Sequence, residues 1–209
     1  MNEQCTSGQY VDAQHIEGEY IEGQLITDKN FQNVTIEQSK FADCDFENCR
    51  FEECKIIGCV FVNCRFYNCT VITLSSRHSE VKNAVLKKCN LIGVHWNALR
   101  PTGKYAHAID KLETCYIKYN SFVEMSFVKF DFSTNTVEES VFEECNLAES
   151  NFRGCRLEGT QIVRSDIRKA DFRDAVGYGI DILSNKMSNA RFSFPEAVRL
   201  LDSLQIKID

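Results

Sequence analysis

The feature that most constrains this chain is an apolar residue at every fifth position. From Ile16 to Trp96, sixteen of the seventeen residues at this spacing are apolar, and Ser76 is the exception. From Leu112 to Phe192 the proportion is again sixteen of seventeen, and Gly177 is the exception. Apolar residues make up 44% of the whole chain, so chance would place about 15 of them at these positions. A period of five matches neither the 3.6-residue helix nor the two-residue strand.

A second row of small residues lies two positions before the apolar ones. From Cys44 to Cys69 this residue is always cysteine, and later it is mostly Cys, Ala, Ser or Thr. The remaining positions are largely polar. A chain that turns a corner every five residues explains both rows, because the large and the small residue then point into a narrow shaft. Four such sides would close a coil of about 20 residues, and successive coils would stack by parallel pairing about 4.8 Å apart.

The two rows therefore predict an all-β fold, a quadrilateral parallel β-helix over residues 16–192 that follows a lead-in at residues 1–15. The frame slips at residues 97–111, which contain Pro101 and Gly103 and are predicted to form a bulge or a loop. In the first coil the positions reserved for small residues carry Glu19, Gln24 and Lys29. Either this coil is an open cap, or its frame is shifted. The shifted frame would place Tyr20 and Leu25 inward, with Gly18 and Gly23 as the small residues.

The last segment, residues 193–209, changes character. Ser193 to Glu196 has the pattern of a capping box with a proline in the first turn, which predicts a short α-helix. Its apolar residues recur at helical spacing and would cap the last coil or contact a second copy of the chain. The predicted contact residues are Phe194, Ala197, Val198, Leu201 and Leu204.

At the level of single repeats the chain resembles the pentapeptide-repeat family. Residues 170–174 (Ala-Asp-Phe-Arg-Asp) and 145–149 (Cys-Asn-Leu-Ala-Glu) are close to its consensus. In length and tail it resembles the Qnr-like group that protects type II topoisomerases, and the tail is most similar to that of the albicidin immunity protein. The resemblance implies a right-handed coil and a homodimer that mimics duplex DNA. It also implies binding to DNA gyrase or topoisomerase IV and protection from a poison such as a quinolone or a peptide antibiotic.

Charge is unevenly distributed along the chain. The net charge of −6 argues against direct binding to nucleic acid. An acidic stripe is predicted to meet a basic groove that normally holds DNA phosphates, and it consists of Glu138, Glu139, Glu143, Glu144 and Glu149. Arg100, Lys104 and Lys111, in or beside the irregular segment, are predicted to form a second contact. The alternative is a repeat scaffold that binds some other protein.

No pattern in the sequence predicts catalysis. Uniform spacing of five between cysteines differs from the paired spacing of zinc ligands, so the cysteines are interpreted as core filler, with no metal site. The sequence shows neither a phosphate loop nor a dinucleotide fingerprint, so we expect a protein that is not an enzyme and needs no cofactor. The absence of an apolar start or a long apolar run favours a cytoplasmic protein without membrane contact.

Overall fold

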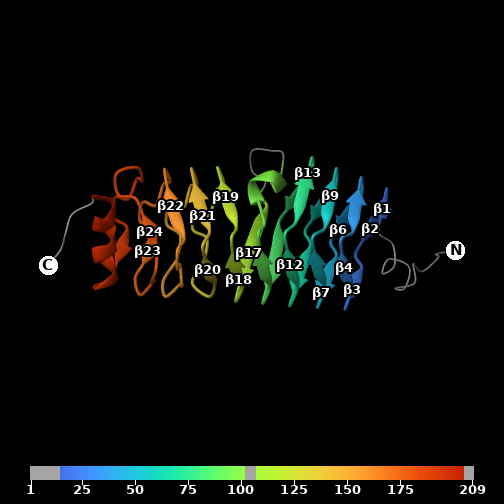
Figure 1. Ribbon diagram of the computed structural model, residues 1–209, viewed down its shortest axis with the longest axis horizontal. Coiled ribbons are helices and arrows are strands. Elements are labelled where there is room, and N and C mark those ends of the chain that lie inside the picture. Colours follow the sequence, from blue (N-terminus) through green and yellow to red (C-terminus); the bar gives the residue numbers. More distant parts are fainter. Residues whose placement is uncertain (1–14, 102–106, 205–209) are drawn as a thin grey trace. The chain divides into compact units, whose positions relative to one another are not determined.

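The computed structural model describes residues 15–101 and 107–204. The chain forms two compact units, an N-terminal unit of residues 1–90 with 98–110 and a C-terminal unit of residues 91–97 with 111–209. Each unit consists of short parallel strands that stack turn upon turn (Figure 1).

Four walls of parallel strands enclose the core of the N-terminal unit. Wall A contains β1 (His15–Glu17), β5 (Thr35–Glu37), β9 (Lys55–Ile57) and β13 (Ser75–Arg77). Wall B contains β2 (Tyr20–Glu22), β6 (Lys40–Ala42), β10 (Val60–Val62) and β14 (Glu80–Lys82). Wall C contains β3 (Leu25–Thr27), β7 (Asp45–Glu47), β11 (Arg65–Tyr67) and β15 (Ala84–Lys87), and wall D contains β4 (Asn30–Gln32), β8 (Arg50–Glu52) and β12 (Thr70–Ile72). Because Phe41 pairs with Phe61 and Phe46 with Phe66, the predicted 20-residue coil is confirmed here.

Three elements lie where the chain passes between the units: β16 (Asn90–Ile92), the 3₁₀ helix η1 (Trp96–Leu99) and β17 (Ile109–Glu113). In the C-terminal unit, wall E contains β18 (Tyr116–Lys118) and β20 (Thr136–Glu138), and wall F contains β19 (Ser121–Val123), β21 (Val141–Glu143), β22 (Gln161–Val163) and β24 (Gly179–Ile180). Wall G is formed by single bridges at residues 126, 146, 166 and 186. Wall H contains β23 (Asp171–Phe172) and β25 (Arg191–Phe192), and the 3₁₀ helix η2 (Glu196–Leu204) follows it.

The inward rows form the core that the sequence predicts. In the C-terminal unit Phe132, Phe152, Phe172 and Phe192 make one stack, with successive ring centroids 4.5, 4.7 and 5.3 Å apart. The cysteines from Cys44 to Cys69 are all at most 1% exposed. Each thiol also has a polar partner, as when the Sγ–H of Cys54 donates to the carbonyl of Phe31 at 3.2 Å. The prediction that these cysteines fill the core is confirmed.

At most corners the second residue after the inward one has a positive φ, a conformation that Asn and Gly tolerate best. Two corners of the N-terminal unit use this position for rows of side-chain amides. The Asn48 Nδ2–H donates to Asp28 Oδ1 at 3.1 Å, and the Asn68 Nδ2–H donates to Asn48 Oδ1 at 2.8 Å. Residues 43, 63 and 83 repeat this arrangement at the neighbouring corner.

The first coil settles the alternative frames. Ile16 is buried, and Ile21 and Ile26 pair with Phe41 and Phe46 of the next turn. The shifted frame is therefore wrong, and Tyr20 and Leu25 are 58% and 61% exposed. Gly18 and Gly23 are corner residues with positive φ, not small inward ones. The large polar residues Glu19, Gln24 and Lys29 remain at least partly exposed, which is the open end expected of a solenoid.

Two details differ from the sequence-based expectation. Ile182 was expected to point inward, but Ile180 pairs with Ile162, because Gly177 with a φ of 79° and the buried Tyr178 shorten this turn by two residues. The predicted terminal helix is present, but its turns are 3₁₀ rather than α. The Val198 N–H bonds to the carbonyl of Pro195, three residues earlier, at 3.0 Å.

Candidate protein-interaction surface

Four of the five predicted glutamates lie together on two adjoining walls of the C-terminal unit. Glu138 ends β20 in wall E and Glu139 forms the corner to wall F. Glu143 ends β21 in wall F and Glu144 forms the corner to wall G. Glu149 is not among them, because it lies one corner further, between walls G and H. Since corners follow every five residues, the predicted stripe runs around the coil.

We call walls E and F, with the corners that follow each of them, the acidic half. It carries seven carboxylates, Glu124, Glu138, Glu139, Glu143, Glu144, Glu158 and Asp181, and three cationic side chains, Lys118, Arg156 and Arg164. The opposite half, walls G and H with their corners, carries five acids and seven bases: Asp131, Glu149, Asp166, Asp171 and Asp174; Lys129, Arg153, Arg168, Lys169, Arg173, Lys186 and Arg191. The C-terminal unit therefore has an acidic side and a side on which bases outnumber acids.

Sequence reasoning missed three members of the acidic half. Glu124 and Glu158 lie one 20-residue turn from Glu144 and Glu138. Stepping by 20 from the predicted glutamates would have found both. A step of 20 residues does not lead to Asp181, because the turn that contains it is shortened.

The carboxylates of the acidic half are held in place by the few cations among them. Lys118 Nζ lies 3.1 Å from Glu139 and 3.9 Å from Glu138, and Arg164 is ion-paired with Glu143 and, at 3.2 Å, with Glu144. The hydrogen bond to Glu139 raises the pKa of Lys118 above its usual value, so Lys118 stays charged. These pairs partly compensate the acids and leave an excess of negative charge with a fixed geometry.

The three predicted basic contact residues fall in different parts of the chain. Lys111 belongs to β17 and its Nζ pairs with Glu113 at 2.6 Å. Arg100 follows η1 in the N-terminal unit and is exposed. Lys104 lies outside the described residues.

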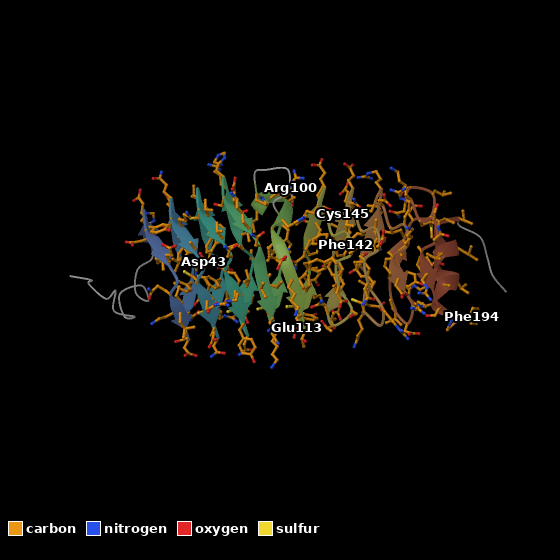
Figure 2. The ribbon with its side chains drawn as sticks, turned by 180° about the vertical axis from the view of Figure 1, so that it is seen from behind. Asp43, Arg100, Glu113, Phe142, Cys145 and Phe194 are labelled. Atoms are coloured by element: carbon orange, nitrogen blue, oxygen red, sulfur yellow. The ribbon has the colours of Figure 1, made fainter. Side chains whose placement is uncertain are left out.

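The terminal helix η2 is anchored at its start and exposes both apolar and charged side chains. The Glu196 carboxylate accepts the Gly177 N–H at 2.8 Å, and the Ser193 hydroxyl accepts the Asp174 N–H at 2.6 Å. Of the predicted contact residues, Ala197 and Leu201 are half-buried, whereas Phe194, Val198 and Leu204 are exposed. Phe194 is 83% exposed and projects from the terminal end, whereas Phe142 and Cys145 lie among the interior side chains (Figure 2). The unit thus presents apolar side chains at this end.

The buried thiols of Cys64 and Cys155 are poor nucleophiles. Burial raises the pKa values of Cys64 and Cys155 to about 12, so these thiols are protonated and weakly nucleophilic near neutral pH. In residues 15–101 and 107–204 no group of three His, Cys, Asp or Glu side chains could hold a metal ion. No helix of this part of the chain is long and apolar enough to span a bilayer.

Comparison with known proteins identifies the repeat. Eight copies of the family pattern described as pentapeptide repeats match residues 30–69 and 139–176. No curated protein matches the sequence. A trypsin-treated variant of QnrB1, described as a plasmid-mediated fluoroquinolone resistance protein, is 18% identical, with 93% of this chain and 99% of that chain covered and a TM-score of 0.39. HetL, a protein from the cyanobacterium Nostoc described as involved in heterocyst differentiation regulation, is 13% identical, with 85% of each chain covered and a TM-score of 0.29.

Proposed function

Since the chain is a pentapeptide-repeat protein, we propose that it is a non-enzymatic binding module for a bacterial type II topoisomerase. Its acidic half occupies the basic surface on which DNA gyrase or topoisomerase IV normally holds DNA, and its presence there protects the enzyme from a poison such as a quinolone or a peptide antibiotic. The active form is a cytoplasmic homodimer joined through η2.

The observation that carries this proposal is the concentration of seven carboxylates on two adjoining walls. A surface that evolved to hold DNA phosphates attracts a dense array of fixed negative charges. The bases of the opposite half lie on other walls, and at physiological salt exposed charges separated by more than about 8 Å are largely screened from one another.

The scaffold supports the proposal in a second way. The acidic side chains project from strands and corners whose backbone is bonded to the turns before and after, as at Val141, whose N–H donates to the carbonyl of Asn120 at 3.0 Å. Such a surface is organised before binding, so little conformational freedom is lost when the partner docks. The resemblance of the tail to topoisomerase-protecting proteins points to the same partner.

The alternative is a repeat scaffold for a different protein, and the charge of the opposite half favours it. Walls G and H carry more bases than acids, which a pure mimic of duplex DNA would not require. In that case the acidic half would bind another basic protein surface.

Gyrase supercoiling, measured across a titration of the protein with and without the poison, tests the proposal. We expect supercoiling in the presence of the poison to recover as the protein is added, and to recover less as salt rises. If the protein neither protects nor inhibits at any ratio, the topoisomerase proposal fails and the scaffold alternative replaces it.

A further inference from the structure

Tyr119 occupies an unusual position within the acidic half. It forms a corner between walls E and F, just after β18, where the backbone φ is +57°. Among the described residues with positive φ it is the one Tyr, Phe or Trp, and most of the others are Asn, Asp, Glu, Lys or Gly. A bulky side chain is disfavoured in this left-handed region. The aromatic ring is nevertheless 52% exposed, so burial in the core does not explain it.

The ring of Tyr119 contacts Lys118, which is itself held by a neighbouring carboxylate. Lys118 Nζ lies 4.9 Å from the ring centroid, a cation–π contact. The same ammonium pairs with Glu139 at 3.1 Å, and Glu138 accepts a hydrogen bond from the Tyr116 hydroxyl at 2.9 Å. An exposed aromatic side chain that is fixed before binding loses little entropy when it is inserted into a partner.

We propose that Tyr119 is the anchor residue of the acidic half. Its ring enters an apolar socket in the partner, and Glu138 and Glu139 contact Lys or Arg side chains around that socket. Binding energy concentrates in a few such residues, among which Tyr is enriched, while the surrounding charges mainly steer the approach. The inference rests on the proposed function for the identity of the partner and adds the feature that the partner's surface must contain, a socket framed by cations.

Two other tyrosines provide a comparison. Tyr20 and Tyr67 are also exposed and also lie beneath a lysine, with Lys40 Nζ at 5.2 Å and Lys88 Nζ at 5.3 Å from the ring centroids. Both are in strands of the N-terminal unit, with no positive φ and outside the acidic half. A lysine over an exposed ring is therefore common in this protein, whereas a tyrosine in a left-handed corner among carboxylates occurs once in the described residues.

The test compares Tyr119→Asn with Tyr119→Phe and with the matched control Tyr20→Asn, by thermal unfolding and by affinity for gyrase. Asparagine suits the left-handed corner, so Tyr119→Asn should unfold at the same temperature as the wild type or higher. Its affinity should fall about 10- to 30-fold, as for other anchor residues. Tyr119→Phe keeps the ring and should bind within about threefold of the wild type. Tyr20→Asn should bind as the wild type does.

Three results would overturn the inference. If the wild type binds gyrase and Tyr119→Asn binds equally well, Tyr119 is not an anchor, and the proposed function stands without it. If Tyr119→Asn lowers the unfolding temperature and the affinity together, the role of the ring is structural. If the wild type itself does not bind gyrase, both the proposed function and this inference are wrong.

Discussion

The indole Nε1–H of Trp96 donates a hydrogen bond to Oδ1 of Asn120 at 3.0 Å inside the shaft of the C-terminal unit. Both side chains are buried. The Asn120 Nδ2 group donates to the carbonyls of Leu91 and Lys118 at 2.7 and 2.8 Å. Asn120 takes the position of a small inward residue where the turn is lengthened, and its amide links the indole of Trp96 to the backbone of two turns.

Replacing Asn120 with Ala should therefore destabilise the protein strongly. The change leaves the Trp96 N–H without its acceptor and removes the donor to the Leu91 carbonyl, whereas the Lys118 carbonyl keeps the Gly93 N–H at 2.9 Å. We expect the free energy of unfolding to fall by about 2–4 kcal/mol. Urea unfolding measures the change. Asn146→Ala is the control, because its exposed amide accepts only a local bond from the Ala148 N–H. Equal stability of the two variants would show that the Asn120 bonds contribute little.

The narrow shaft predicts how a cysteine row responds to side-chain size. Cys54 is 1% exposed. Cys54→Leu should lower the free energy of unfolding by about 1–3 kcal/mol through overpacking, and Cys54→Ala should lower it less. Chemical denaturation of both variants tests this order. A leucine that is tolerated better than alanine would mean that the shaft can widen.

The buried thiols predict a loss of stability in alkali. A thiol with a raised pKa in the folded state stays protonated there after it has ionised in the unfolded chain. Between the unfolded pKa of about 8.5 and the folded value of about 12, the free energy of unfolding should therefore fall as pH rises, by about 1.4 kcal/mol per pH unit for each such thiol. Cys155→Ala should show a shallower decline than the wild type. If the free energy of unfolding of the wild type and of Cys155→Ala fell equally steeply from about pH 9 to 11, the raised pKa of Cys155 would be contradicted.

The exposed apolar side chains of η2 predict an assembly through the terminal end. Leu201→Asp combined with Leu204→Asp should convert a dimer into a soluble monomer, because a buried carboxylate in an apolar interface is costly. Phe194→Asp should also weaken the dimer while leaving the fold intact, since this ring is exposed. Sedimentation velocity measures both, with Asp202→Asn as the control on the same helix. If the wild type sediments as a monomer at micromolar concentration, the prediction of a dimer joined through η2 is wrong.

The acidic half predicts a loss of binding on charge reversal. Changing Glu138, Glu139, Glu143 and Glu144 to Lys should weaken binding to gyrase and flatten its salt dependence, because the electrostatic attraction is lost. Circular dichroism should show that the fold persists, since all four side chains are at least partly exposed. Glu149→Lys is the single-site control on the opposite half. Similar affinity for the wild type and the fourfold variant would exclude the acidic half as the binding surface.

The regular part of this fold could be predicted because each inward position repeats the same physical requirement. In every turn an inward position such as that of Phe152 needs a large side chain, and one such as that of Cys155 needs a small side chain. The positions of the walls and corners therefore follow from counting residues in fives. The same counting leads to the acidic half only when it is combined with the 20-residue turn. That step brings Glu124 beside Glu144, although the two are far apart in the sequence.

The irregular positions could not be predicted, because they depend on contacts that no local pattern contains. The shortened turn at Gly177 and Tyr178 places Ile180 rather than Ile182 beside Ile162. The left-handed conformation of Tyr119 belongs to the regular pattern of corners, but its contact with Lys118 depends on side-chain conformation and could not be predicted.

The amide rows at the corners have a direction, and it bears on how such a chain could have grown by duplication. In each row an Asn donates its Nδ2–H to the residue one turn earlier, and the first member is Asp28 or Asp43. A carboxylate accepts but has no N–H to donate, so it can begin a row and cannot continue one. Copying a turn that carries Asn would extend a row toward the C-terminus, whereas an extra turn ahead of the aspartate would receive no bond from it. The two aspartates thus mark where the amide rows begin, and the coil itself continues ahead of Asp43, where Gly23 forms the same corner one turn earlier.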